Sequence, residues 1–325
     1  MAIRQRIRQL QLPCTTEAFP AGTIVNGNSE LSVSWPEILW AALTIGRPSV
    51  YHVFQHGSSS LHEAIFRLSL VRMALEQYGP SATRLRRTAA FKNLDPTEKG
   101  AISYFLGMTF CKVFASRLLS TPWLLHLDAF KATTSMSSLG RSRPDLFGQQ
   151  TGTGEWLAFE TKGRASKPSA ADRAKAKAQA TRLVAVSGSP CTLHVGAFTF
   201  FVNDALNFYW IDPLPEPREQ IKIPEIGDAW RYYYEPARAL WRARTPDTET
   251  KDDGELALPF PELDITLHVH PLLAPLFVLK TWEAAQRIMF EAEARLKADG
   301  FQPDGLKVEC GPSWRARWES GRERS

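Results

Sequence analysis

The fold of this chain is indicated most clearly by residues 143–162, which read RPDLFGQQTGTGEWLAFETK. A short strand-like run, 143–147, is followed by a Gly-rich segment, 148–154, and then by an apolar run, 156–162. Two strand-like runs separated by glycines and polar residues are typical of a β-hairpin. This stretch therefore predicts two neighbouring antiparallel strands.

Three charged residues on these strands have the pattern of a reactive site. Side chains alternate between the two faces of a strand, so Glu160 and Lys162 point to one face and Thr161 to the other. Pairing of the two strands then brings Asp145 beside Glu160. Two adjacent carboxylates repel each other, and a buried pair needs a proton or a cation. Mg²⁺ prefers such oxygen ligands, and a nearby lysine can position water or stabilise charge on a phosphate.

The segments around the hairpin predict an α/β arrangement. Asp95-Pro96-Thr97-Glu98 combines an N-cap, a proline in the first turn and an acidic residue, which is a helix start. The apolar residues that follow cover most of the helix surface, so this helix should be largely buried. The predicted order is helix 96–119, strand 123–130, strand 143–147, strand 156–162, helix 170–186, strand 192–201 and strand 207–211.

Pro144-Asp145 followed by Glu160-Thr161-Lys162, within this order of elements, resembles the signature of the PD-(D/E)XK nuclease superfamily. The resemblance implies a restriction-endonuclease-like core, a small mixed sheet flanked by helices. It covers roughly a third of the chain. We expect an α/β fold with three regions: a helical N-terminal region, 1–94; the nuclease-like core, 95–215; and an α+β C-terminal extension, 216–325.

The resemblance also implies roles for individual residues. Asp145 and Glu160 would be metal ligands, and the backbone carbonyl of Thr161 would add a third protein oxygen. Lys162 would be the catalytic lysine. The implied cofactor is Mg²⁺, with Mn²⁺ as a possible substitute, and the implied reaction is hydrolysis of phosphodiester bonds in DNA. Members of the superfamily serve in restriction, repair, recombination and defence against mobile elements.

The chain departs from the superfamily's pattern in two places. Many members carry a further acid on the first core helix, whereas here only Glu98 is present, in its first turn. Some members place a Gln and a Tyr one helical turn apart after the lysine; here Gln179 is followed by Leu183. Basic residues near the same helix are candidate phosphate contacts. The candidate nucleic-acid-binding residues are Arg164, Lys167, Lys175, Gln179 and Arg182.

Composition sets wider limits on function. The 325 residues include 39 Lys and Arg against 34 Asp and Glu, a formal charge of +5 (39 − 34), which permits a polyanionic partner. The four cysteines have neither zinc-ligand spacing nor the pattern of a disulfide framework, which favours a reducing, cytoplasmic environment. We expect no secretory signal and no membrane partner. A Walker A loop, a Rossmann fingerprint and a G-x-S-x-G motif are absent from the sequence.

Several alternatives remain open at this stage. Taken singly, Asp145 and Glu160 could form salt bridges with Arg143, Lys162 or Arg164. The same fold could serve as a non-catalytic nucleic-acid-binding or assembly subunit, or as a nuclease directed at RNA. Because double-strand cleavage usually needs two active sites, a homodimer or a partner subunit is also compatible with the sequence.

Overall fold

A computed structural model provides the structure of the chain. It describes residues 9–48, 58–78, 83–133, 143–212, 220–224, 226, 229–244, 249–250, 254–273 and 285–315.

A large mixed sheet of 11 strands forms the centre of the fold. Its main path runs β2-β1-β10-β9-β7-β6-β5, and the pairs β1–β10 and β7–β9 are parallel. β3, β4, β8 and β11 join outside this path. The strands are β1 (Leu10–Glu17), β2 (Gly27–Val33), β3 (Leu75–Tyr78), β4 (Arg84–Arg87), β5 (Trp123–His126), β6 (Leu146–Gln149), β7 (Trp156–Gly163), β8 (Leu183–Val186), β9 (Ser189–Val202), β10 (Ala205–Ile211) and β11 (Ile221–Ile223).

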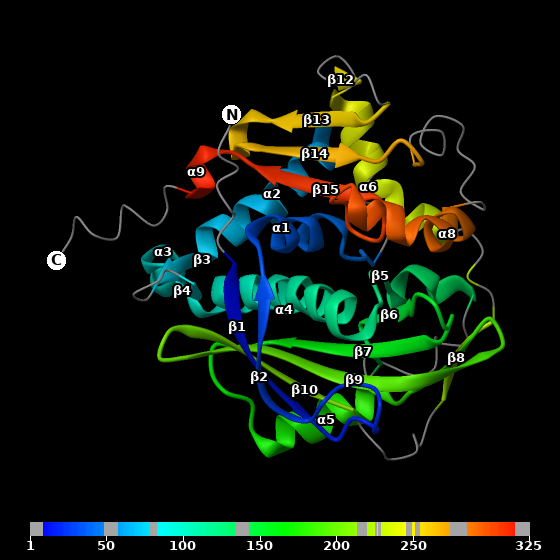
Figure 1. Cartoon of the computed structure of the whole chain (residues 1–325). Coiled ribbons are helices and arrows are strands. Elements are labelled where there is room, and N and C mark those ends of the chain that lie inside the picture. The colour runs from blue at the N-terminus through cyan, green and yellow to red at the C-terminus, as the bar shows by residue number, and fades with distance from the viewer. Residues whose placement is uncertain are drawn as a thin grey trace.

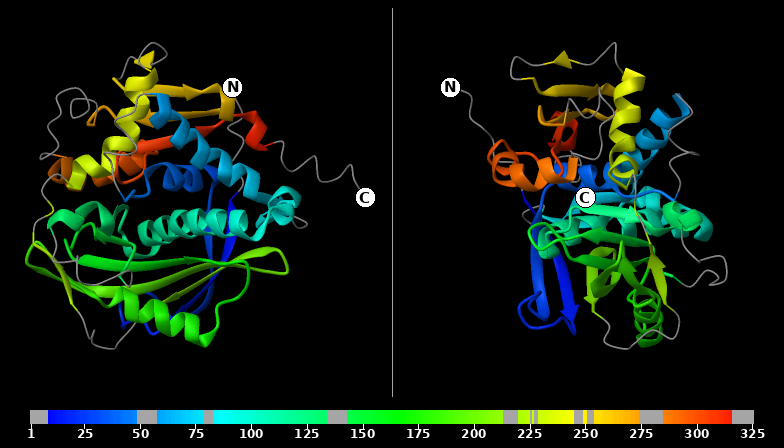
Figure 2. Two further views of the ribbon diagram at one scale, coloured as in Figure 1. Left: turned by 180° about the vertical axis from the view of Figure 1, so that it is seen from behind. Right: turned by 90° about the vertical axis from the view of Figure 1, so that its right-hand side faces the viewer.

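Helices cover both faces of this sheet. α4 lies against one face and α5 against the other, while α1 packs on the far side of α4 (Figures 1 and 2). The α-helices are α1 (Trp35–Thr44), α2 (Ser58–Ala74), α3 (Ala89–Asn93), α4 (Pro96–Leu119), α5 (Ala170–Ala180), α6 (Ala229–Arg244), α8 (Ala285–Ala298) and α9 (Pro312–Arg315). The chain is thus α/β, as predicted.

The N-terminal region is not purely helical, so the expectation for residues 1–94 was incomplete. β1 pairs in parallel with β10, and β2 pairs with β1. β1 has the alternating burial of a strand with one face in the core, with Leu10, Leu12 and Cys14 buried. Its partner strand lies almost 200 residues further along the chain, and this pairing extends the central sheet well beyond the predicted small core.

α4 is the central helix, and its predicted bounds are confirmed. The Asp95 carboxylate accepts hydrogen bonds from the backbone N–H groups of Thr97 and Glu98, and the Glu98 carboxylate accepts one from Asp95 N–H. Among the described residues, α4 alone has the length and apolar composition to cross a membrane, and 72% of its apolar window is buried inside the fold. Burial on this scale is what a core helix shows.

The hairpin forms, but its first strand starts later than predicted. β6 begins at Leu146, and Asp145 lies just before it. Both backbone groups of Asp145 are nevertheless hydrogen-bonded: its N–H donates to Phe159 O of β7 (3.1 Å), and its carbonyl accepts from the N–H of Leu127, directly after β5 (2.9 Å). The strand predicted at 123–130 ends at His126, where a 3₁₀ turn, η1 (Leu127–Thr133), begins.

The predicted helix 170–186 was wrong in its second half. α5 ends at Ala180, and residues 183–186 form β8, which pairs antiparallel with β9. Ser187 and Gly188 connect the two strands with φ values of +48° and +80°. Positive φ at both central residues belongs to the tight hairpin turns that match strand twist. Leu183 therefore lies on a strand and not one helical turn after Gln179.

A second sheet of four strands contains the C-terminal segments. Its strands are β12 (Glu249–Thr250), β13 (Leu256–Phe260), β14 (Ile265–Val269) and β15 (Leu306–Cys310), with the 3₁₀ turn η4 (Pro261–Leu263) between β13 and β14. β14 pairs antiparallel with both β13 and β15. α8 lies between β14 and β15 in the chain.

A buried polar cluster joins this second sheet to α4. Lys112 of α4 and Asp304, just before β15, are both fully buried, and Asp304 accepts a hydrogen bond from Trp40 Nε1 of α1 (2.7 Å). The Tyr233 hydroxyl of α6 bonds to both Lys112 and Asp304. A buried charge is tolerated when it is paired and hydrogen-bonded, so this cluster binds four distant segments together.

Candidate functional site

Glu160 lies near the end of β7 and is almost completely buried, with 1% of its surface exposed. Opposite it in the parallel ladder is Gly196, where an added Cβ would lie 3.5 Å from Ala176 Cβ of α5. Glu160 therefore faces α5. Lys162 lies on the same face, as the strand alternation predicts, and its Nζ forms an ion pair with Glu160 Oε1. The second carboxylate oxygen, Oε2, is buried without a hydrogen-bond partner.

Asp145 flanks this pair from the start of β6. Its Oδ2 accepts two hydrogen bonds from Thr161, one from the backbone N–H and one from the hydroxyl, each 2.9 Å long. Within the described part of the chain, Asp145 pairs with no cation. The salt-bridge alternative is therefore met for Glu160, through Lys162, but not for Asp145. Arg143 pairs instead with Asp128.

Burial gives Glu160 an unusual titration. Desolvation, together with the smaller effect of the negative charge of Asp145, raises the pKa of its carboxyl to about 8, against the opposing effect of Lys162. With Lys162 already beside it, the Glu160 carboxyl is neutral at physiological pH unless a further cation binds. Such strong perturbation beside a second acid and a lysine is characteristic of functional sites, although ion-pair networks also produce it.

Gln179 is placed on the same side of the sheet as Glu160. It is buried on the face of α5 that contacts the sheet, and its Oε1 has no hydrogen-bond partner. Buried polar atoms are rarely left unsatisfied, and each exception requires an explanation such as an ion. Two unpartnered buried oxygens, on Glu160 and Gln179, thus belong to neighbouring elements that contact each other.

The side of the sheet facing α4 contains residues that the sequence reasoning missed. Met108 Sδ lies 3.1 Å from the Thr161 hydroxyl oxygen. The negative charges of Asp145 and Glu160 raise the pKa of both Tyr104 and Cys111. Burial raises the pKa of the Cys111 thiol, which makes this cysteine a poor nucleophile. Spacings of four and three residues place Tyr104, Met108 and Cys111 along one face of α4, and that periodicity was the available signal.

The basic candidates occupy different environments. Lys167 and Lys175 are exposed, while Arg164 is ion-paired with Asp172 at 2.6 Å. Arg182 is half-buried. It lies in the turn after α5 and not on the helix, since α5 ends earlier than predicted. Lys167 and Lys175 are therefore the two candidates in this set best placed to meet a phosphate in solution.

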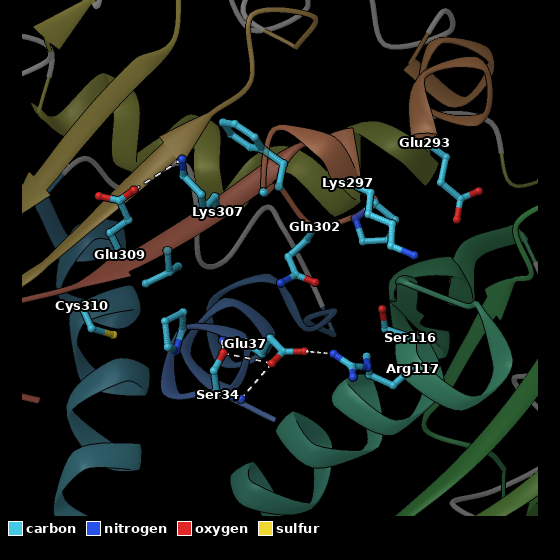
Figure 3. A pocket seen from close by; sticks show the side chains of 15 residues that line it. Ser34, Glu37, Ser116, Arg117, Glu293, Lys297, Gln302, Lys307, Glu309 and Cys310 are labelled. Carbon is cyan, nitrogen blue, oxygen red and sulfur yellow. Dashed lines mark hydrogen bonds and ion pairs between the residues drawn. The ribbon is translucent and has the colours of Figure 1, made fainter. Parts of the chain in front are cut away.

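A separate cavity of about 780 Å³ lies between α1, α4, α8 and β15 (Figure 3). Its charged side chains are largely compensated: Arg117 pairs with Glu37 at 2.6 Å, and Lys307 lies 3.4 Å from Glu309. Its lining residues do not include Asp145, Glu160 or Lys162. The cavity is therefore distinct from the candidate site.

The residues present fit a divalent cation in their chemistry. Glu160 and Asp145 supply carboxylate oxygens, one of them unpartnered and buried, and hard divalent ions bind oxygen ligands. Within the described residues, no group of three or more His, Cys, Asp or Glu side chains forms a metal-binding cluster. Two carboxylates completed by a backbone oxygen, water and a substrate phosphate are an arrangement that Mg²⁺ accepts.

No protein family, curated protein or solved structure matches this chain.

Proposed function

We propose that the chain is a metal-dependent nuclease that hydrolyses phosphodiester bonds in DNA, on a PD-(D/E)XK-like core. One observation carries the proposal: a buried carboxylate with an unpartnered oxygen, Glu160, lies beside a second carboxylate, Asp145, and an ion-paired lysine, Lys162. Such a group is costly to bury without a cation, and the three residue types together match the chemistry of phosphodiester hydrolysis. The order of α4, β5, β6, β7, α5 and β9 further supports the resemblance.

Each residue has a distinct role in this proposal. Asp145, Glu160 and the Thr161 carbonyl would hold Mg²⁺, which supplies a water of lowered pKa and positive charge for the phosphate. The hydrogen bonds from Thr161 fix the Asp145 carboxylate. Lys162, held by Glu160, stabilises the negative charge that develops on the phosphate and orients the attacking water. The exposed Lys167 and Lys175 contact the backbone of the nucleic acid.

Cleavage assays with matched variants test the proposal. Plasmid, linear duplex and single-stranded DNA, together with RNA, are incubated with Mg²⁺, Mn²⁺ or EDTA. Asp145→Ala and Lys162→Ala are compared with Glu155→Ala, which removes an exposed acid just before the other end of β7. We expect metal-dependent cutting that is lost in the first two variants and kept in the third.

Other results would change the assignment. Cutting that survives Asp145→Ala and Lys162→Ala contradicts the proposed site. Binding without cutting supports the non-catalytic alternative, a nucleic-acid-binding or assembly subunit. Cutting of RNA in preference to DNA keeps the site and changes the substrate.

A further inference from the structure

A cluster of aromatic rings lies on the surface where α2 and α4 meet. Phe66 is 54% exposed and Tyr104 is 41% exposed. Both rings contact Phe105, which is partly buried: the Phe66 and Phe105 centroids are 5.9 Å apart, and those of Tyr104 and Phe105 are 5.7 Å apart. Both contacts are edge-to-face. We call these three residues the aromatic surface.

This surface adjoins the candidate site through the packing of α4 on β7. A Cβ added to Gly163, the residue after Lys162, would lie 1.6 Å from the backbone oxygen of Ser103 and 2.9 Å from the backbone nitrogen of Tyr104. Only a glycine permits this approach of helix and strand. Tyr104 is thereby fixed beside the end of the strand that carries Glu160 and Lys162.

Electrostatics indicate the same proximity. Partial burial is the main cause that raises the pKa of the Tyr104 hydroxyl to about 12. The negative charges of Asp145, Asp128 and Glu160 act in the same direction, and Arg67 acts against them. Two of these three carboxylates are the proposed metal ligands. The aromatic surface thus lies on the α4 side of the sheet, where the Thr161 hydroxyl bonds to Asp145, at the end of the strand whose other face carries Glu160 and Lys162.

A cation completes the chemistry of this surface. The Arg67 guanidinium lies over the Phe105 ring, 5.0 Å from its centroid, and is held there by an ion pair with Glu63. Glu63 is fixed in turn by the buried Arg47 at 2.9 Å. Rings supported by an arginine are the elements that bind unpaired bases by stacking, without reading their sequence.

We propose that Phe66 and Tyr104 form a stacking platform for unpaired bases beside the candidate site, at the end of β7 near Asp145, so that the preferred substrate is single-stranded nucleic acid or a frayed end. This inference rests on the proposed nuclease function. In a continuous duplex each base face is covered by its neighbours, and the platform has nothing to stack on. Single strands expose these faces, and stacking on aromatic side chains is tolerant of sequence.

Binding measured without cleavage tests the platform. Fluorescence anisotropy is recorded in EDTA with labelled single-stranded and duplex DNA of about 20 nucleotides, longer than a usual single-strand site. The variants are Phe66→Ala, Tyr104→Ala and Tyr104→Phe, which retains the ring. Val25→Ala is the matched control, because Val25 is an exposed apolar residue in the connection between β1 and β2.

We expect Phe66→Ala and Tyr104→Ala each to weaken single-strand binding by roughly tenfold, within the range measured when one stacking side chain is replaced by alanine. Duplex binding should change less, and Tyr104→Phe and Val25→Ala should bind like the wild type. Circular dichroism of each variant confirms that it is folded. In Mg²⁺, the ratio of single-strand to duplex cleavage should fall in the two alanine variants.

Three results would overturn the platform: unchanged single-strand affinity in both alanine variants, equal losses on single strands and duplexes, or altered self-association in sedimentation with oligonucleotide binding intact. The last would identify the surface as a contact between copies of the chain. The binding measurement uses no metal, so its outcome does not depend on cleavage. The nuclease proposal fails separately if cleavage needs neither metal nor Asp145.

Discussion

Replacing Glu160 by glutamine tests the electrostatic basis of the candidate site in metal-free protein. Glutamine has nearly the same shape but does not ionise. In the folded protein burial raises the pKa of Glu160 from 4.5 to about 8. The native state therefore holds this proton more tightly than the unfolded chain at every pH between these two values. Consequently, the free energy of unfolding falls as pH rises through this window.

The size of the effect follows from the two pKa values. Between about pH 5.5 and about pH 8.5, ionisation of Glu160 should remove roughly 3 kcal/mol from the stability of the wild type. The Glu160→Gln variant lacks this contribution. The difference in unfolding free energy, variant minus wild type, should therefore grow by about that amount over the interval.

Urea unfolding in EDTA at several pH values measures this difference. Glu155→Gln, which changes an exposed carboxylate on the same hairpin, is the matched control. At the alkaline end of the range, Mg²⁺ should stabilise the wild type, since a ligand that binds only the native state raises its stability. The Glu160→Gln variant should gain less. A pH-independent difference between Glu160→Gln and wild type would refute the argument that Glu160 is buried at an electrostatic cost.

Three further predictions concern other residues. Asp304→Ala leaves Lys112 buried without its counter-charge and should lower the unfolding free energy by about 3–5 kcal/mol. The double variant that also carries Lys112→Met should recover part of this stability. Urea unfolding measures both. Gly163→Ala drives a methyl group into the backbone of α4 and should lower the unfolding free energy by at least about 1–3 kcal/mol. Gly100→Ala, in α4 with open space around it, should raise the unfolding free energy by roughly 0.5–1 kcal/mol. Thermal or urea unfolding measures both variants. Lys175→Ala should weaken nucleic-acid binding. It should also reduce the slope of log affinity against log salt concentration by about 0.7–0.9 for each phosphate that the variant no longer neutralises. An unchanged slope in a salt titration would exclude a phosphate contact by Lys175.

Local signals in the sequence are sufficient to place the start of a helix that carries a complete N-cap. Asp95 and Glu98 form a reciprocal capping box at α4, and Ser34 and Glu37 do the same at α1. These hydrogen bonds join residues three positions apart, so the residue types alone report them. The hairpin of β6 and β7 was also foreseeable, because Gly152 and Gly154 have φ values of +85° and +75° that favour glycine.

Contacts between distant segments were not foreseeable in the same way. β1 is stabilised by β10, and no local pattern names that partner. β8 was mistaken for the end of a helix because its position is decided by pairing with β9 and β11, which outweighs the helical tendency of the preceding alanines. In the candidate site, the pattern predicted the shared face of Glu160 and Lys162, but not the hydrogen bonds that turn the Asp145 carboxylate onto Thr161.

The packing of α4 links the two proposals made for this chain. One side of the helix carries Lys112, which is linked through the Tyr233 hydroxyl to Asp304 in front of the second sheet, and another presses against Gly163 at the end of β7. The anchor and the close approach together fix the helix relative to the strand that holds Glu160. A catalytic site requires its groups to be held to within a fraction of an ångström, which rigid elements do better than loops. The C-terminal sheet thus contributes to the candidate site without lining it, because it holds α4, and with it Tyr104, in place.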